Sequence, residues 1–398
     1  MENHLYSYDL KMDQLGEELE QLDNLKFLLI ENKKIDDTVR ENFPIRNFGN
    51  TEDFLRIHGS KKLLQTFEKL DADKDDFMET LSNVQYIGLS HDNELILNFP
   101  EQNIKATSIY SFKSEFLSEF SIEKYVSFCS RNDFADIVKD NLDKLFKKFS
   151  TKEKQYRLLR DRDKQWRIRG FTSDRYNNYD NGIALYLSLL AIHKYASENN
   201  IFYHVDRAYL SDSAIYIMFE QDEPIKIEGI GDIYMGIAVS NGEIRNRTFR
   251  FDTRYRIVNP KKDKEFSAIL NNSMFSIVHN MGVNKIENYL KNMVNLKEHQ
   301  DSIIDFISKI DYAEPLSDDA VYMLMNDLIR RISECSDISK TTKDSFKQAE
   351  IKNIINNTLT LIDFLDKANS IITDIDERIF IERIFHQVMA NFINSKNI

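Results

Sequence analysis

The sequence predicts an α+β protein: an antiparallel sheet with one central helix, in the order ββ-α-ββ-ββ, between mostly helical N- and C-terminal segments. Short apolar runs bounded by polar turns recur between Tyr156 and Val258, which is typical of strands. One long apolar run, Gly182–Ser197, interrupts them and predicts a helix. From Phe266 onward the pattern predicts helices to the last residue.

Charge divides the chain into three parts. Residues 1–150 carry a net charge of −10, residues 151–264 of +4 and residues 265–398 of −6, within a total of −12 over 398 residues. A chain of this length exceeds one core, so we expect three domains: an acidic, mostly helical N-terminal region with a β-hairpin, a basic α+β core domain and a helical C-terminal domain. The acidic total argues against a general nucleic-acid coat protein, and the basic middle part indicates anion binding.

The N-terminal region is expected to be helical around one hairpin. Leucines at helical spacing over residues 15–29 predict an amphipathic helix that packs on its own domain, with a dimer seam as the alternative. Val84–Leu89 and Leu95–Phe99 predict the β-hairpin. Two helices are expected to follow, over Ser111–Phe120 and Ile122–Phe149.

The middle part supplies the sheet. Tyr156–Arg160 and Gln165–Thr172 predict a first hairpin joined by a polar turn, and Asp180 or Asn181 is expected to cap the central helix. Further strands are predicted over Ile201–Leu210, Ala214–Glu220, Asp232–Val239 and Ile244–Val258. Downstream, Pro315 and the start signal at Ser317 divide the C-terminal part into at least three helices.

Several classes of protein and site are disfavoured. No apolar run is long enough for a membrane span and no secretory signal opens the chain, so we expect a cytoplasmic protein with two unpaired thiols, Cys129 and Cys335. The acidic segment after Leu70 only superficially looks like a calcium loop, because Asp76 stands where glycine is required and Ser82 where glutamate is required. We interpret it as a helix start, and we expect no metal and no cofactor.

Arginines alternate with aromatic residues on two predicted strands. On the first strand Arg167, Arg169, Phe171 and Ser173 share one face, opposite Trp166, Ile168 and Thr172; on the second, Arg250, Asp252, Arg254 and Arg256 share one face, opposite Phe249, Phe251, Tyr255 and Ile257. If both strands join one sheet, up to five arginines cover one surface. Guanidinium groups bind phosphates and aromatic rings stack on bases, which favours a nucleic-acid surface. A salt-bridged face with Asp161, Asp163, Asp174 and Asp252 as internal partners stays open.

The connection before the central helix is a second candidate. Arg175 and Tyr176 lie where a strand meets a helix N-terminus, and such termini bind anions. The candidate anion-binding residues are therefore Arg167, Arg169, Arg175, Tyr176, Arg250, Arg254 and Arg256. His193 is expected to be a buried histidine whose hydrogen bonds are satisfied. His204 and Asp206 share a strand face, a geometry that would allow them to form a site with Asp174.

Two short motifs follow the predicted helical segment Phe112–Phe149: RLLR at 157–160 and RGFTSDRY at 169–176, with Asp180-Asn181 after them. Together they resemble domain-of-unknown-function family 932, a group associated with phages and plasmids, over approximately residues 105–285. The turn and strand that follow in that family have a counterpart at residues 240–260, although a His-Asp pair and a Cys are missing here. The resemblance implies an origin in a mobile element and no particular activity.

Three functions are open. The first is a phage-type nucleic-acid-binding protein that holds single strands, as an annealing or protecting factor in an oligomer. The second is an interaction protein that binds a host factor, such as a defence component. The third is an enzyme in which Asp174, Asp206 and Asp252 hold a divalent ion while Arg169 and Arg175 clamp a phosphate. No catalytic motif is present, so binding ranks above catalysis, with single-stranded nucleic acid, a host protein or a second copy as partner.

Overall fold

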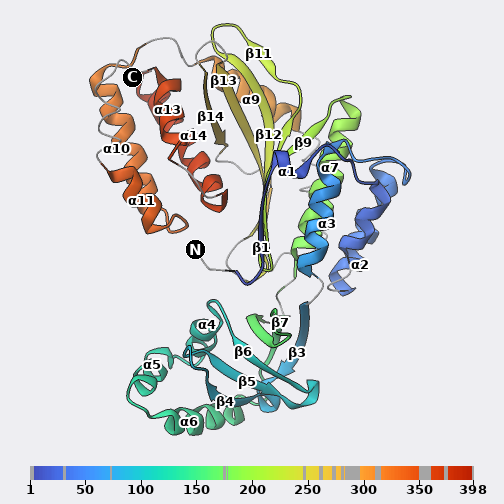
Figure 1. The fold of residues 1–398 in the computed structure, drawn as a ribbon, viewed down its shortest axis with the longest axis vertical. Helices are drawn as coiled ribbons and strands as arrows, with labels where there is room; N and C mark the ends of the chain where they lie inside the picture. Colours follow the sequence, from blue (N-terminus) through green and yellow to red (C-terminus); the bar gives the residue numbers. More distant parts are fainter. Residues whose placement is uncertain are drawn as a thin grey trace.

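The protein folds around two β-sheets (Figure 1). The structure, a computed structural model, describes residues 4–29, 33–71, 74–173, 176, 178–244, 248–259, 263–270, 275–278, 282, 296–309, 315–348, 360–371 and 375–396. The sheets are mostly antiparallel and helices pack beside them, which confirms the α+β class. The main elements between residues 153 and 259 follow the predicted order ββ-α-ββ-ββ, but their strands lie in two sheets and not in one.

The larger sheet is antiparallel except at one short strand. Its main path runs in the order β1 (Ser7–Lys11), β9 (Tyr203–Ser211), β10 (Ala214–Gln221), β12 (Gly231–Gly242), β13 (Phe249–Asn259) and β14 (Lys264–Ile269). Three short strands join it: β2 (Ile57–His58) parallel to β9, β11 (Ile225–Ile227) beside β12, and β15 (Phe275–Ile277) beside β13.

The smaller sheet contains the hairpin that the sequence assigns to the middle of the chain. Its order is β3 (Lys74–Thr80), β7 (Glu153–Arg160), β8 (Trp166–Thr172), β6 (Ile104–Ser108), β5 (Leu95–Phe99) and β4 (Gln85–Leu89), with β6 and β8 parallel. The helices α4 (Phe112–Ser118), α5 (Glu123–Arg131) and α6 (Ala135–Lys148) complete this part, and η3 (Leu81–Asn83) and η4 (Pro100–Gln102) are single 3-10 turns within it. We call residues 74–172 the small lobe and the other described residues the large lobe; Figure 1 shows the small lobe below the large one.

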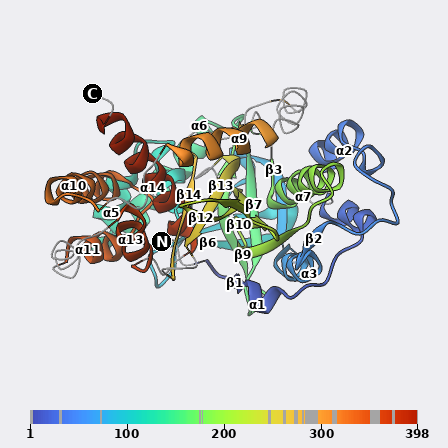
Figure 2. The same ribbon diagram turned by 90° about the horizontal axis from the view of Figure 1, so that it is seen from above.

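Helices cover both sides of the large sheet (Figures 1 and 2). On one side of the sheet lie α7 (Asn181–Glu198) and the helices from the first part of the chain: α1 (Met12–Leu15), η1 (Leu22–Leu28), α2 (Lys33–Asn42), η2 (Ile45–Asn47) and α3 (Ser60–Asp71). On the other side lie helices from the C-terminal part of the chain: α10 (Asp318–Glu334), α11 (Lys340–Lys347), α13 (Leu361–Asn369) and α14 (Ile375–Lys396). That part of the chain also supplies α9 (Leu296–Ser308). Ser317 caps α10 through its side chain, as the start signal predicts.

The central helix α7 is buried on all sides. Its residues 181–193 are all buried, and it packs against the large sheet and η1 in one apolar core. A helix that is apolar all round belongs in a protein core. Gly182 allows α7 to lie directly against η1, because a Cβ at this position would be 2.2 Å from the backbone oxygen of Leu28.

Four local predictions are wrong. The helix predicted over residues 15–29 is α1 followed by η1, although its leucines are buried in their own lobe as expected. The helix predicted over Ile122–Phe149 breaks at Asp133, where φ is 61°. The acidic segment after Leu70 continues into strand β3 rather than starting a helix, and the helical pattern predicted from Phe266 begins inside strand β14.

The described part of the chain contains no disulfide. No helix there is long and apolar enough to cross a membrane. Cys129 is buried, Cys335 is half-buried, and both are free thiols, as expected.

Candidate functional site

The candidate arginines lie in two different sheets. Arg167 and Arg169 lie on β8 of the small lobe, whereas Arg250, Arg254 and Arg256 lie on β13 of the large lobe. The condition for one shared arginine surface is therefore not met. The β7–β8 hairpin pairs with β3 and β6 and so completes the small sheet.

The alternation of side chains holds on one strand and fails on the other. On β13 the aromatic residues share one face, as predicted, but this face is buried in the two cores of the large lobe and its rings cannot stack on bases. On β8 the register shifts: Arg157 opposes Gly170, but Leu158 opposes Ile168, so Arg169 is the extra residue of a β-bulge. The bulge places Phe171 in the core beside Ile168, not on the arginine side.

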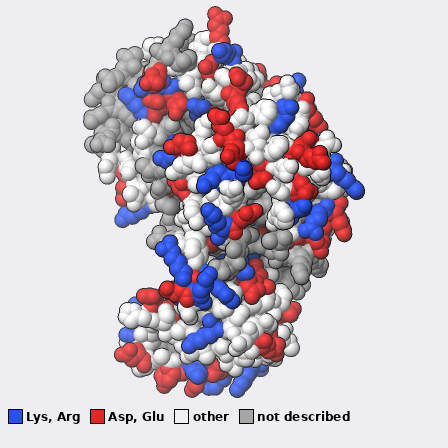
Figure 3. All heavy atoms as spheres, turned by 45° about the vertical axis from the view of Figure 1, so that its right-hand side comes forward, with Lys and Arg blue, Asp and Glu red and all other residues white. Residues whose placement is uncertain are grey.

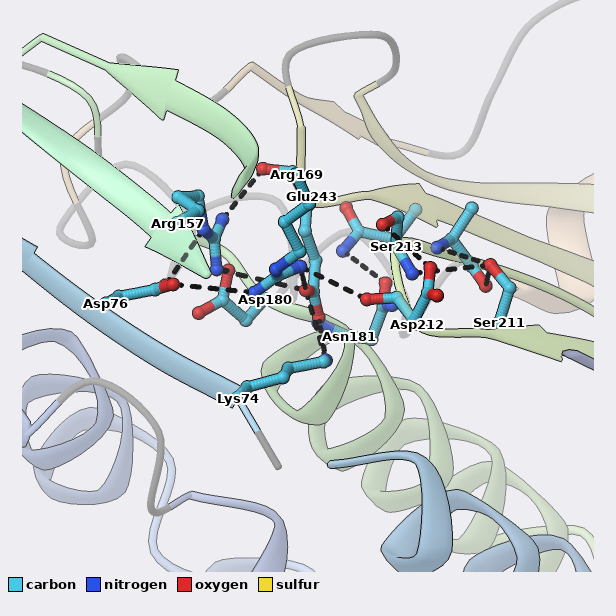
Figure 4. Close-up of polar contacts among 12 residues, drawn as sticks. Lys74, Asp76, Arg157, Arg169, Asp180, Asn181, Ser211, Asp212, Ser213 and Glu243 are labelled. Carbon is cyan, nitrogen blue, oxygen red and sulfur yellow. Dashed lines mark hydrogen bonds and ion pairs between the residues drawn. The ribbon is translucent and has the colours of Figure 1, made fainter. Parts of the chain in front are cut away.

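Arg169 is buried between the two lobes. Its guanidinium forms an ion pair with Glu243, which follows β12, and donates a hydrogen bond of 3.1 Å to the backbone oxygen of Asp212. Lys74 of β3 reaches the same Glu243 carboxylate at 3.0 Å. Figure 4 shows these side chains converging from both lobes. Arg169 is thus held inside the protein and does not face an external phosphate.

A second buried arginine extends this network. Arg157 of β7 donates hydrogen bonds to Asp180 Oδ1 at 2.7 Å, to Asp76 Oδ2 at 2.8 Å and to the backbone oxygen of Glu243 at 2.7 Å (Figure 4). We call the six charged residues the ionic hub: Lys74, Asp76, Arg157, Arg169, Asp180 and Glu243. The hub joins the small sheet to the start of α7 and to the end of β12.

Glu243 caps the central helix. Its carboxylate accepts a hydrogen bond of 3.0 Å from the backbone N–H of Asn181, whereas Asp180, at the N-cap position, makes no capping bond through its side chain. Asp180 is thus the N-cap residue, as predicted, but the predicted capping bond from its side chain is not made, and Glu243 supplies it instead. Burial raises the pKa of Glu243, but Lys74, Arg169 and Arg157 outweigh it and hold the pKa below its usual range. The anion at this helix terminus is a side chain of the protein itself.

The connection before α7 offers little exposed chemistry among its described residues. The Tyr176 hydroxyl donates a hydrogen bond of 3.4 Å to the backbone oxygen of Glu243, so this ring is turned toward the hub. Arg175 and Asp174 lie outside the described residues.

The arginines of β13 are paired with carboxylates. Buried Arg254 contacts Glu382 of α14 at 2.8 Å and Asp206 of β9 at 3.0 Å. Arg250 contacts Asp252 at 3.3 Å. These contacts match the salt-bridged alternative for this face.

Arg256 is held in the same way. Its guanidinium contacts Glu220 at 2.5 Å and Glu265 at 2.9 Å, and it lies over the ring of Tyr234 at 4.4 Å. One quarter of its side chain is exposed. A phosphate would have to displace two carboxylates here.

The metal-site hypothesis gains no support. Asp206 pairs with Arg254, and Asp252 pairs with Arg250 and with Arg383 of α14. The described residues contain no group of three or more His, Cys, Asp or Glu side chains that could hold a metal ion. His193 is buried and accepts a hydrogen bond of 3.2 Å from the backbone N–H of Arg56, as expected for a satisfied core histidine.

The β7–β8 turn is organised from within by one aspartate. Asp161 accepts hydrogen bonds of 2.9 Å from the backbone N–H groups of Asp163 and Gln165, and of 2.7 Å from Arg167. Burial raises the pKa of Asp161, but the bonds from Gln165 and Arg167 outweigh it and lower the pKa. Asp161 thus fixes the turn and neutralises Arg167.

The other cations of this turn point outward. Arg160, Arg162 and Lys164 are exposed, and the Arg160 guanidinium lies over the ring of Trp166 at 4.5 Å. Within the described part of the chain, neither Arg160 nor Arg162 has an ion-pair partner. The Tyr6 hydroxyl donates to the backbone oxygen of Arg160 at 3.1 Å, which places the turn beside the start of β1. Figure 3 shows Lys and Arg side chains gathered at this narrow junction of the two lobes.

Sequence reasoning missed this turn as a site because it treated residues 161–164 only as a polar connection. The signal was present: Arg160, Arg162 and Lys164 recur at every second position beside the one tryptophan. In a tight turn such residues point away from the sheet, whereas arginines inside the strands face other elements.

No protein-family model, curated protein or solved structure matches the chain. The resemblance to family 932 therefore stays a prediction.

Proposed function

We propose that this protein binds single-stranded nucleic acid at the β7–β8 turn, in the cytoplasm of a bacterial host of a mobile element. One observation carries the proposal: Arg160, Arg162 and Lys164 are exposed around Trp166, while Asp161 is used inside the turn. Of the arginines expected to bind nucleic acid, Arg167 lies beside this turn, on β8, where it is paired with Asp161.

The turn supplies both parts of single-strand recognition. Arginine and lysine side chains bind phosphates by releasing condensed counterions, which requires no base sequence. The Arg160 guanidinium covers one face of Trp166 and presents its own outer face, on which a base can stack. A site of three phosphate contacts predicts that log Kobs falls with log salt with a slope of about −2.

The single tryptophan gives a direct measurement. Trp166 is the one Trp in the chain, so its fluorescence reports on this turn alone. Titration with an oligothymidylate or oligouridylate at low salt should change its emission, and the double variant Arg160→Ala/Arg162→Ala should bind at least about tenfold more weakly. Duplex DNA should bind more weakly than a single strand, because its bases are already stacked.

A matched variant controls for net charge. Lys147→Ala/Lys148→Ala removes the same charge from exposed positions on α6 and should leave binding unchanged. Equal losses in both double variants would mean that binding is spread over the surface and not located in the turn. Absence of any binding to single strands at low salt would overturn the proposal.

An interaction with a host protein is a second candidate. Phe128, Phe134 and Ile137, on and beside α5 and α6, are each more than two fifths exposed, and the first two rings lie 6.3 Å apart. Adjacent exposed apolar side chains favour protein contacts. Cross-linking in host lysate should lose its specific product in Phe128→Ser/Phe134→Ser, whereas retention of the product would exclude this patch.

A further inference from the structure

A groove of about 1060 Å³ opens on the large lobe between α1 and the strands β2, β9 and β12. Two histidines, His58 and His204, line it together with Asp222. Its volume is in the range of sites that bind small molecules or a few nucleotides. The proposed binding site at the β7–β8 turn does not include it.

The two histidines lie side by side. His58 of β2 and His204 of β9 are register partners in a parallel pair, so their side chains leave the same face of the sheet. His204 Nδ1 lies 2.9 Å from Asp222 Oδ1, and His58 Nε2 lies 3.8 Å from Asp222 Oδ2. One carboxylate therefore holds one imidazole firmly and lies near the other.

The second nitrogen of His204 is available for chemistry. A proton on Nδ1, donated to Asp222, leaves the lone pair on Nε2. Nε2 lies 3.9 Å from Glu220 Oε1, which is beyond hydrogen-bond distance, and that carboxylate is already held by Arg256. A carboxylate–histidine pair of this kind is a general base without a metal.

Three cations line the groove, and a phosphate that binds there must compete with the carboxylates that hold two of them, Arg207 and Arg256. Lys11, Arg207 and Arg256 line it, and Arg207 is fixed in place by two hydrogen bonds to Asp9, of 2.6 and 3.0 Å. The strand β1 connects the groove to the nucleic-acid site: Tyr6 contacts Arg160 at one end, and Lys11 lies in the groove at the other. Five residues of strand span about 17 Å, the reach of a few nucleotides.

We propose that the groove cleaves single-stranded RNA by metal-free transesterification, an inference that rests on the proposed function because the β7–β8 turn supplies affinity for the strand. His204 Nε2 removes the proton of a ribose 2′-hydroxyl, and the 2′ oxygen attacks the adjacent phosphorus. The bond from phosphorus to the 5′ oxygen breaks, and His58 donates a proton to that oxygen. The products are a 2′,3′-cyclic phosphate and a 5′-hydroxyl, so no metal, water or other co-reactant enters the step.

The substrate class follows from this chemistry. The attacking oxygen is the 2′-hydroxyl, so RNA reacts and DNA of the same sequence binds without reaction. Asp222 acts as a positioning residue, because it holds the His204 ring and tautomer without touching the substrate.

The test uses a fluorescent RNA oligomer with the full-length protein in excess EDTA. The expected product carries a 2′,3′-cyclic phosphate, and one 2′-deoxy nucleotide at the cut position should abolish cleavage there. His204→Gln and His58→Gln should each lose at least about a hundredfold in rate. His91→Gln, at a fully exposed histidine in the β4–β5 turn, is purified in parallel and should keep the full rate.

Each outcome decides between the proposals. Cleavage that persists in His58→Gln/His204→Gln would overturn the inference, since the activity would come from elsewhere. RNA that binds at Trp166 but is not cut by the unaltered protein would also overturn it, while leaving the proposed function in place. Loss of binding in Arg160→Ala/Arg162→Ala with slower cutting at low RNA concentration would support both. Asp222→Asn should slow cleavage without weakening RNA binding, whereas a purely structural role would change neither.

Discussion

The carboxylate of Glu243 accepts the backbone N–H of Asn181 at 3.0 Å while it pairs with Lys74 and Arg169 from the small lobe. One side chain therefore caps the central helix of one lobe and binds the sheet of the other. The ion pairs of the hub therefore join the two lobes.

Loss of the Glu243 charge should destabilise the whole protein. Glu243→Gln leaves Lys74 and Arg169 buried without their shared anion, and removing one member of a buried pair costs about 3–5 kcal/mol. Urea unfolding followed by circular dichroism measures the loss. Glu228→Gln, at an exposed position, should cost less than about 0.5 kcal/mol. Similar midpoints for both variants would show that the hub does not stabilise the fold.

Replacing Gly182 by alanine should destabilise the protein, because the backbone of η1 lies against this position. Gly182→Ala places a Cβ 2.2 Å from the backbone oxygen of Leu28, so η1 or α7 must move. We expect a loss of about 3 kcal/mol, which exceeds the gain of about 1 kcal/mol in helix propensity. Gly88→Ala is the matched control, because a Cβ there meets nothing within 4 Å. Thermal unfolding of the two variants makes the comparison, and an unchanged midpoint for Gly182→Ala would contradict the packing.

Asp180 should make the protein less stable as the pH rises. Burial, opposed by Arg157, raises the pKa of Asp180 to about 6. The folded state therefore keeps a proton that the unfolded state loses between about pH 4 and 6. The stability that this proton contributes is complete below the unfolded pKa and is lost as the pH rises through 6.

The variant Asp180→Asn isolates this effect. The asparagine mimics the protonated aspartic acid and does not titrate. The free energy of unfolding of the variant, relative to that of the unaltered protein, should therefore increase as the pH rises from 4 to 7. Urea unfolding across that range measures the gain. A difference that stays constant with pH would show that Asp180 does not titrate in this way.

His386 should make the protein less stable as the pH falls, the opposite of the dependence expected for Asp180. Burial lowers its pKa to about 4, and its ring contacts the Tyr255 hydroxyl at 3.1 Å and the Phe306 ring at 4.7 Å. Between about pH 6.5 and pH 4, His386 is protonated in the unfolded state but not in the folded state. The free energy of unfolding therefore decreases as the pH falls through this range. His386→Gln cannot titrate and should flatten the acid limb of stability against pH. His91→Gln should leave that limb unchanged; an equal change in both variants would refute the assignment.

Local sequence patterns predicted much of the large sheet. The alternation on β13, the apolar run of α7 and the Ser317 cap each depend on neighbours within a few residues, so the sequence shows them directly. The bounds of the predicted strands also agree closely with β9, β10 and β12.

Long-range pairing was not visible in the same way. The β7–β8 hairpin is compatible with either sheet, and its place is decided by β3 and β6, which lie far earlier in the chain: Lys74 of β3 pairs with Leu159 of β7. For the same reason the arginines of β8 and β13 looked equivalent in sequence, although Arg169 meets Glu243 and Arg254 meets Glu382. A buried ion pair between distant residues leaves no local signature, whereas the exposed turn at Arg160 and Arg162 did leave one.

The pairing of β1 with β9 sets an order of events during synthesis. Ser7 lies opposite Ser211, and the backbone N–H of Tyr6 bonds to Asp212, so the first described residues find their partners only about 200 residues later. When synthesis of the whole small lobe, residues 74–172, is complete, β9, the partner of β1, has not yet been synthesised. Strand β1 must stay unpaired until β9 has been synthesised, and chaperones that bind extended segments have that interval in which to act.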